Sequence, residues 1–122
     1  MAETLFIVNP SSDERTRLTA ALADDAVAIE IYESIAEFFE QVSDMASGCV
    51  VAPIDLPDPG LRAMIDDITR RRLALAVVVL GRDSELGSAA ELVRAGAFDF
   101  LEHPFSDHRL RSVVRRAIGA AP

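Results

Sequence analysis

The sequence predicts a doubly wound α/β domain: a parallel five-stranded sheet of order 2-1-3-4-5 with helices on both faces. Apolar runs of strand length alternate five times with stretches of helical periodicity. The connections between them are short, as expected when successive elements pack beside one another. The second run alternates polar and apolar residues, so it belongs at an edge of the sheet, where this strand order places it.

The composition is that of one folded domain. The chain has 122 residues, of which 50% are hydrophobic, and we expect the domain to span 1–119, with 120–122 as a tail or the start of a linker. A net charge of −8 argues against nucleic-acid binding by this domain alone. No apolar run approaches the ~20 residues that span a membrane. A single cysteine, Cys49, excludes an intrachain disulfide and is compatible with a cytoplasmic protein.

The first half of the chain supplies three strands and two helices. A β-branched and aromatic run forms the first strand, and cap residues after it begin a helix that ends near residue 23. The pattern from Ser34 to Glu37 is a capping box that opens the second helix. The third run is apolar throughout, as in a strand covered on both faces. The expected strands are 4–8, 27–32 and 49–52.

The second half supplies two strands, at 75–80 and 98–101, and three helices. Three arginines, at 70–72, end the third helix, and we interpret them as a solvated helix end that complements the helix dipole. The fourth helix is expected to bury Leu86, Ala89, Ala90 and Val93. The last helix is expected to begin at the cap residue Ser106, to bury Leu110, Val113, Val114, Ala117 and Ile118, and to stop near Gly119.

Residues 94–106, RAGAFDFLEHPFS, resemble the fifth-strand signature of the receiver domains of two-component response regulators, which ends in Lys-Pro-Phe. Residues 5–8 at the first strand, 56–57 after the third and 77–81 at the fourth support the resemblance. It covers almost the whole chain and is strongest to the FixJ-like type. The resemblance implies a flavodoxin-like, CheY-like fold and a role in bacterial signal transduction.

The same resemblance implies that the phosphorylation site has lost its chemistry. A working receiver has an acidic pair after the first strand and a phosphoacceptor aspartate after the third, which together bind Mg²⁺. A hydroxyl after the fourth strand and a lysine after the fifth contact the phosphoryl oxygens. These five positions are held here by Asn9, Pro10, Pro53, Leu80 and His103. Since proline offers no nucleophile, we expect a degenerate pseudo-receiver that needs neither Mg²⁺ nor another cofactor and is not an enzyme.

Two further residues near this site have expected roles. Phe100 matches the switch aromatic that the family couples to the fourth-strand hydroxyl. Because its neighbour here is Leu80, we expect Phe100 to keep one permanent core contact. Asp55 lies two residues after Pro53, and we interpret it as a cap of the third helix and not as a substitute phosphoacceptor.

By resemblance, partners are expected to bind the face made by the fourth helix, the fifth strand and the last helix. Acidic and basic side chains lie side by side there, an arrangement that allows a self-complementary homodimer or a contact with another protein. An ordinary solvated helix face is the alternative. The candidate residues are Glu91, Arg94, Asp99, Arg109, Arg111, Arg115 and Arg116.

Two other functions remain open from the sequence. The chain could be the N-terminal regulatory domain of a longer FixJ-like DNA-binding transcription regulator. Alternatively, the vestigial site could sense a small molecule, although no glycine-rich phosphate loop supports this. The sequence shows no nucleophile paired with a base, so we do not expect an enzyme.

Overall fold

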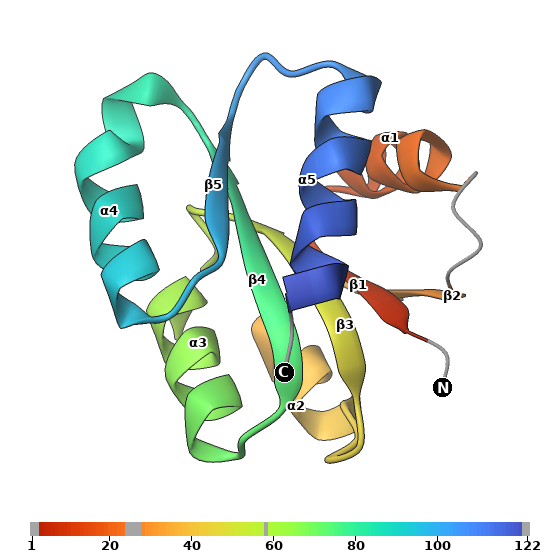
Figure 1. The fold of residues 1–122 in the computed structure, drawn as a ribbon, viewed down its shortest axis with the longest axis vertical. Helices are drawn as coiled ribbons and strands as arrows, with labels where there is room; N and C mark the ends of the chain where they lie inside the picture. Colours follow the sequence, from red (N-terminus) through yellow and green to blue (C-terminus); the bar gives the residue numbers. More distant parts are fainter. Residues whose placement is uncertain (1–2, 24–27, 58, 121–122) are drawn as a thin grey trace.

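The computed structural model describes residues 3–23, 28–57 and 59–120, which form one parallel sheet of order β2-β1-β3-β4-β5 (Figure 1). This is the order that the sequence predicts, with β2 at one edge and β5 at the other. The elements are β1 (Thr4–Val8), α1 (Ser12–Leu22), β2 (Ala28–Tyr32), α2 (Ile35–Gln41), β3 (Ser47–Pro53), α3 (Gly60–Arg70), β4 (Ala74–Gly81), the 3-10 helix η1 (Asp83–Glu85), α4 (Leu86–Ala95), β5 (Asp99–Glu102) and α5 (Asp107–Ala120). Residue 27, the expected start of the second strand, lies outside the described residues.

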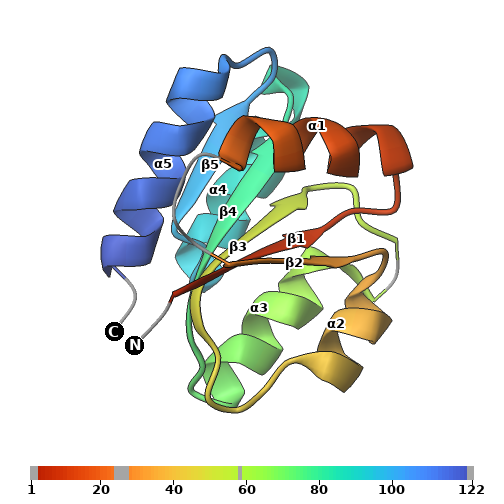
Figure 2. The same cartoon turned by 90° about the vertical axis from the view of Figure 1, so that its right-hand side faces the viewer.

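The helices form a layer on each face of the sheet (Figure 2). Helices α1 and α5 cover one face, where the core includes Leu18, Val51 and Leu110. Helices α2, α3 and α4 cover the other face, where Phe38, Met64 and Leu92 belong to the second core cluster. β3 lies between β1 and β4, and its residues 48–52 are buried, which explains why the sequence shows no polar alternation there.

Local chemistry sets the helix ends on the N-terminal side. The hydroxyls of Ser11, Ser34 and Ser106 accept the backbone N–H groups of Glu14, Glu37 and Arg109, respectively. These bonds confirm the helix starts expected at Ser34 and Ser106. Gly119 does not end α5, since the helix continues to Ala120, and Ile118 is only half-buried.

Gly48 allows β1 and β3 to approach each other closely. Its φ is +139°, and a Cβ at this position would lie 2.0 Å from the carbonyl oxygen of Thr4 on the neighbouring strand. Only glycine fits such a conformation without strain. Gly48 lies inside β3, because the strand begins at Ser47. This start is two residues before the start at Cys49 that the sequence predicts.

Helix α4 turns a different face inward than its apolar pattern predicts. Ala89 and Leu92 are buried, whereas Leu86 and Val93 are 52% and 43% exposed and Ala90 is also exposed. The prediction that Leu86, Ala90 and Val93 are buried is therefore wrong. The ten residues of α4 carry apolar side chains on more than one side, so periodicity alone does not select the buried face.

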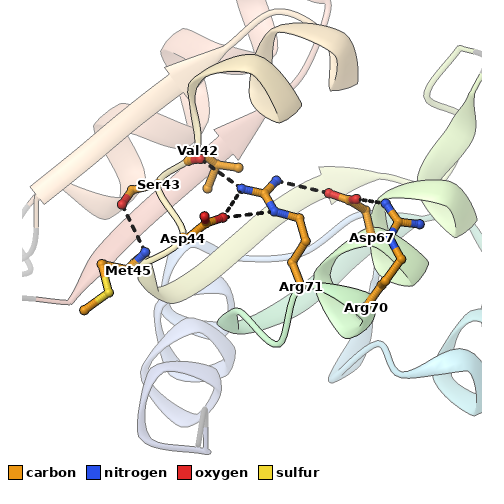
Figure 3. Close-up of polar contacts among 7 residues, drawn as sticks. All are labelled: Val42, Ser43, Asp44, Met45, Asp67, Arg70 and Arg71. Carbon is orange, nitrogen blue, oxygen red and sulfur yellow. Dashed lines mark hydrogen bonds and ion pairs between the residues drawn. The ribbon is translucent and has the colours of Figure 1, made fainter.

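Arg71 joins the end of α3 to the loop between α2 and β3 (Figure 3). Its guanidinium donates to the Val42 carbonyl at 3.2 Å and pairs with Asp44 at 2.6 Å and Asp67 at 3.2 Å. Asp67 also pairs with Arg70. The arginines were expected to form a solvated helix end, but the side chain of Arg71 is only 26% exposed. Arg71 therefore bridges two segments of the fold.

Candidate functional site

A pocket of about 360 Å³ opens at the carboxyl ends of β1, β3 and β4. This is the edge where open α/β sheets bind their ligands. The pocket brings together all five positions that the family resemblance assigns to the phosphorylation site. Its lining residues are Asn9, Pro10, Ser11, Glu14, Pro53, Ile54, Asp55, Leu80, Gly81, Arg82, Glu85 and His103.

The segment after β1 uses its polar groups to start α1. Asn9 is 5% exposed, and its side-chain oxygen accepts the backbone N–H of Ser11 at 2.9 Å. The guanidinium of Arg15 donates to the Asn9 carbonyl at 2.8 Å. Pro10 is exposed between these residues and offers no side-chain ligand. The oxygen that Asn9 could offer to a cation is thus already engaged in holding the turn before α1.

Apolar groups form the floor of the pocket. Pro53 is the last residue of β3 and lies in register with Leu80 on β4. The N–H of Ile54 donates to the Leu80 carbonyl at 2.8 Å. Leu80 itself is 2% exposed and belongs to the core beneath α1 and α5. Neither Pro53 nor Leu80 carries a group that could attack or hydrogen-bond a phosphoryl group.

His103 lines the pocket from the end of β5 and stacks on an aromatic neighbour. Its ring centroid lies 4.7 Å from that of Phe105, and the guanidinium of Arg17 lies 5.7 Å from the Phe105 centroid. The peptide bond between His103 and Pro104 is cis. These contacts link the pocket wall to α1, because Arg17 lies on that helix.

Phe100 packs against the core on the α2–α4 side of the sheet and is half-buried. A Cβ at Gly81 would lie 2.7 Å from the Phe100 ring and 3.0 Å from Ile54. Because Gly81 has no side chain, the ring can approach the end of β4 closely. The position of Phe100 against the core agrees with the core contact that the sequence predicts. That Phe100 does not switch between two positions stays a prediction.

Three carboxylates line the pocket: those of Glu14, Asp55 and Glu85. The sequence did not predict that these three side chains lie together. Glu14 lies in the first turn of α1, and one of its oxygens, Oε2, is buried and has no hydrogen-bond partner among the described residues. Glu85 Oε1 accepts the Arg82 N–H at 2.8 Å. Asp55 is exposed, and α3 begins at Gly60 with Pro59 as its N-cap and no side-chain cap hydrogen bond, so the expected capping role of Asp55 is wrong. The signal that could have found them is position, because all three lie within six residues of strand ends.

Among the described residues, no cluster of metal-binding side chains is found. In the described ranges 3–23, 28–57 and 59–120, no three His, Cys, Asp or Glu side chains are placed to hold one metal ion. A magnesium ion needs several oxygens in octahedral geometry, usually from carboxylates and water.

The candidate interface residues do not all share one face. Glu91 and Arg94 are exposed on α4, and Arg109, Arg115 and Arg116 are exposed on α5. Asp99 is half-buried on β5, between these helices in Figure 1.

Arg111 instead turns toward α1, where it donates to the Ala21 carbonyl at 3.1 Å. Its expected outward position is therefore wrong. Arg111 supplies a cation to the C-terminal end of α1, which has no basic residue in its own last turn.

The parallel doubly wound sheet, with a pocket at the carboxyl ends of its strands, defines a CheY-like signalling fold. The chain belongs to the response regulator receiver domain family, whose profile matches residues 5–115. This confirms the resemblance on which the site positions rest. Receiver domains are signalling modules of two-component systems.

Three similar proteins place the chain within this family. It is 26% identical over 121 residues to the transcriptional regulatory protein FixJ of Azorhizobium caulinodans. The aligned region covers 98% of this chain and 57% of that protein. A response regulator receiver protein from Pseudoalteromonas atlantica has a TM-score of 0.82 and 28% identity, over 98% of this chain and 99% of that one. Full-length FixJ from B. japonicum shares the fold, with a TM-score of 0.89 and 21% identity, over 98% of this chain and 59% of that one.

The chain thus spans little more than half of the FixJ proteins that it matches. Among the described residues, none of the helices is both long and apolar enough to cross a membrane.

Proposed function

We propose that this receiver domain signals through protein contact in the cytoplasm, without phosphorylation and without Mg²⁺. Pro53 is the observation that carries the proposal. It ends β3 and lines the pocket at the position where the family has its phosphoacceptor aspartate. Proline has no side-chain atom that can accept a phosphoryl group, so the defining covalent step of a receiver has no nucleophile here.

The surroundings of Pro53 support the same proposal. Asn9 uses its side-chain oxygen to hold Ser11, and Leu80 is a core residue. His103 stands where the family has a lysine and stacks on Phe105. The phosphoryl group would therefore lack its metal ligands and its hydroxyl, and the lysine cation would be replaced by an imidazole.

A surface on α4 supports protein contact as the alternative means of signalling. Leu86, Ala90 and Val93 are four and three residues apart, so they form one exposed apolar stripe along the helix. We call these three residues the α4 stripe. Exposed apolar side chains that gather on one face are typical of interaction sites. Arg94 on α4 and Asp99 on β5 supply charges of both signs for specificity.

The FixJ relatives suggest a second role that does not compete with this one. FixJ is described as a transcriptional regulatory protein, and the chain matches only part of it. A domain that works by contact could serve as the regulatory part of a longer transcription regulator of that type. Sequencing the complete gene would establish whether a DNA-binding module follows residue 122.

Exposure to a phosphoryl donor tests the proposal. The chain is incubated with acetyl phosphate and Mg²⁺, and intact mass is measured without acid treatment. We expect no adduct, because no acceptor stands at residue 53. A FixJ receiver carrying its aspartate serves as the positive control. A stoichiometric, acid-labile phosphoryl adduct on any aspartate of this chain would contradict the proposal.

A further inference from the structure

We propose that the outer edge of β2 binds an extended, cationic segment of a partner protein, which adds a strand to the sheet. This goes beyond the proposed function, which places protein contact on α4, beside β5 at the other edge of the sheet. The proposal rests on the unpaired backbone of β2, on a pocket that borders this strand, and on the charge of the surrounding segment.

The backbone of β2 is unpaired on its outer side. In the part of the chain that the structure describes, β2 pairs with β1 alone, over Ala28–Tyr32. The Tyr32 carbonyl accepts the Asn9 N–H at 3.0 Å, so Tyr32 directs its backbone groups toward the sheet. Since neighbouring residues of a strand direct these groups to opposite sides, those of Ile29 and Ile31 point outward. Such a row of N–H and C=O groups is a template for a further strand.

The side chains of β2 leave this edge accessible. Ile31 is 42% exposed, and Ala28 and Glu30 are exposed as well. Proteins commonly protect an edge strand with proline, lysine or a bulge. β2 contains neither proline nor lysine, and its register with β1 is continuous. Its charged residue is the acidic Glu30, which favours a partner of opposite charge.

A pocket of about 260 Å³ borders the same strand on the α2 side of the sheet. Phe6 and Met45 supply apolar lining, and Glu30, Gln41 and Ser43 supply polar groups. Because Glu30 belongs to β2, a side chain that an added strand turns toward α2 lies next to the pocket. In strand addition the backbone supplies affinity, and pockets of this kind select the side chains of the added segment.

The loop that carries Met45 is held in place, although Met45 itself is 82% exposed. The Ser43 hydroxyl accepts the Met45 N–H at 3.0 Å, and Asp44 pairs with Arg71 at 2.6 Å (Figure 3). The Ala46 N–H also donates to the Ser43 carbonyl at 3.0 Å. The loop therefore fixes Met45 at the rim of the pocket. A thioether there packs adaptably against the alkyl stem of a long cationic side chain.

The charge around the edge selects a basic segment. The stretch from the start of β2 to the start of β3 contains five carboxylates and no arginine, lysine or histidine. Arginines from α1 and from the end of α3 pair with two of them, Glu33 and Asp44. The other three, Glu30, Glu37 and Glu40, take part in none of the ion pairs that the described residues form. A cationic partner is therefore attracted to this side of the domain.

A second copy of this chain is a poor occupant of the edge. A symmetric antiparallel pair centred on β2 would place Glu30 opposite its own copy, and like charges directly opposite are destabilising. The net charge of −8 adds a general repulsion between copies. A foreign segment that alternates β-branched residues with arginine or lysine meets both requirements. Its backbone extends the sheet, and its cation reaches Glu30 while the stem lies on Met45.

A designed peptide tests the inference. The acetylated, amidated peptide Thr-Val-Arg-Val-Arg-Val-Thr is added to the ¹⁵N-labelled chain. We expect saturable amide shifts at Ile29, Ile31 and Met45. Hydrogen exchange at the outward amides of Ile29 and Ile31 should slow by about tenfold or more, because they become hydrogen-bonded. Two control peptides should show neither effect: one with glutamate in place of arginine, and one that keeps the charge but has every backbone nitrogen methylated.

Variants at residue 31 test the backbone contact. Ile31→Pro removes an outward N–H and leaves the ladder with β1 in place, since proline is tolerated on an edge strand whose N–H faces solvent. It should weaken peptide binding about fivefold or more. Ile31→Val keeps the N–H and the β-branched side chain, so it should change affinity less than about twofold.

A second pair of variants tests the charge. Glu30→Gln should weaken binding about fivefold or more, because it removes the charge beside the pocket while its side-chain oxygen can still accept the Tyr32 hydroxyl. Glu40→Gln removes the same charge from an exposed position on α2 and should change affinity less than about twofold. These variants and the methylated peptide decide the question even if Ile31→Pro fails to fold.

Three results would overturn the inference. The basic peptide gives no saturable shifts, or the methylated peptide binds equally well, which would indicate attraction by charge alone. In the third, the amides of Ile29 and Ile31 shift with protein concentration without peptide, which would make a second copy the occupant. Changing Leu86 and Val93 of the α4 stripe to serine should leave peptide binding unchanged. The inference and the proposed function therefore fail independently.

Discussion

The chemistry of the site changes at individual residues while the backbone of the fold is kept. Pro53 continues the hydrogen-bonded register of β3 with β4 up to Leu80. Proline removes only its own N–H from the ladder, and the next residue, Ile54, still donates to the Leu80 carbonyl. The sheet is therefore intact at Pro53, and the receiver fold does not depend on an aspartate at this position.

Restoring the acceptor alone should not restore phosphorylation. In Pro53→Asp, the aspartate would still lack a metal, because Asn9 and Pro10 replace the acidic pair. We expect little labelling by acetyl phosphate and Mg²⁺, measured by intact mass. Adding Asn9→Asp, Pro10→Asp, Leu80→Thr and His103→Lys should raise labelling by at least tenfold. Equal labelling of the single and fivefold variants would show that the four neighbouring positions do not matter.

At the scale of elements, the network around Arg71 connects α2, β3 and α3. Arg71 satisfies the carbonyl of Val42 and the carboxylates of Asp44 and Asp67, as Figure 3 shows. These hydrogen bonds raise the pKa of Arg71, and the bond to Asp44 is the largest contribution. Asp67 is the better buried partner, at 12% side-chain exposure against 81% for Asp44. Most of the stabilisation is therefore expected from the Val42 and Asp67 contacts.

Arg71→Gln should lower the free energy of unfolding by about 1–3 kcal/mol, because it leaves the Val42 carbonyl without its guanidinium donor and removes one of the two arginines that pair with the buried Asp67. Arg62→Gln is a matched control, since Arg62 forms an exposed pair with Asp66 at 3.2 Å. Exposed pairs contribute about 0–1 kcal/mol. Urea denaturation of both variants measures the difference. Equal losses would mean that Arg71 is no more than a surface charge.

At the scale of the whole molecule, the apolar side chains that the core does not use lie apart on its surface. Leu86 and Val93 belong to α4, next to the edge strand β5. Met45 is 82% exposed in the loop between α2 and β3. Among the described residues, only the α4 stripe combines several such side chains on one helix face, and we expect association to use it.

Changing Leu86 and Val93 together to serine should weaken self-association or partner binding about tenfold or more, because central apolar contacts dominate interface energies. Thermal stability should change little, since both side chains are already exposed. Met45→Ser is the control, because it removes an exposed apolar side chain from a different region. Sedimentation equilibrium of the three proteins at low and high salt measures the effect. Unchanged association in the double variant would place the interface elsewhere.

The pH dependence of stability also belongs to the whole molecule. Burial raises the pKa of Cys49 from 9.0 to about 12. Burial, together with the hydrogen bond that Tyr32 donates to Glu30 at 2.7 Å, raises the pKa of Tyr32 from 10.0 to about 12. Both groups are neutral when protonated, so folding favours their protonated forms. Their contributions to stability are complete below about pH 9 and are lost as the pH rises toward 12.

We therefore expect the free energy of unfolding to fall steadily between pH 9 and 12. The chain contains no lysine, one cysteine and one tyrosine, so few other side chains titrate in this window. Cys49→Ala combined with Tyr32→Phe should make the profile nearly flat over the same range. Urea denaturation at pH 7, 9, 10.5 and 11.5 measures both proteins. A wild-type profile as flat as that of the double variant would contradict the assigned pKa values.

The sequence by itself determined the fold class and the strand order, and it carries the prediction that the phosphoacceptor is missing. Strand and helix periodicities are local properties, and the alternation of β2 distinguishes an edge strand from a buried one. The residue at position 53 is likewise read directly, and family resemblance gives its place. These features depend on residue types and spacings within one segment, so they can be predicted without knowing which distant segments come into contact.

Tertiary structure alone decided which neighbours each exposed side chain meets. Arg111 was expected to face outward with Arg115, but the carbonyl at the end of α1 lies 90 positions away in sequence and within its reach. The outward turn of Leu86 and Val93 depends on which side of a short helix meets the sheet. The unpaired oxygen of Glu14 depends on a pocket assembled from the ends of separate strands. Each of these features arises from contacts between segments far apart in the chain, which residue spacing does not encode.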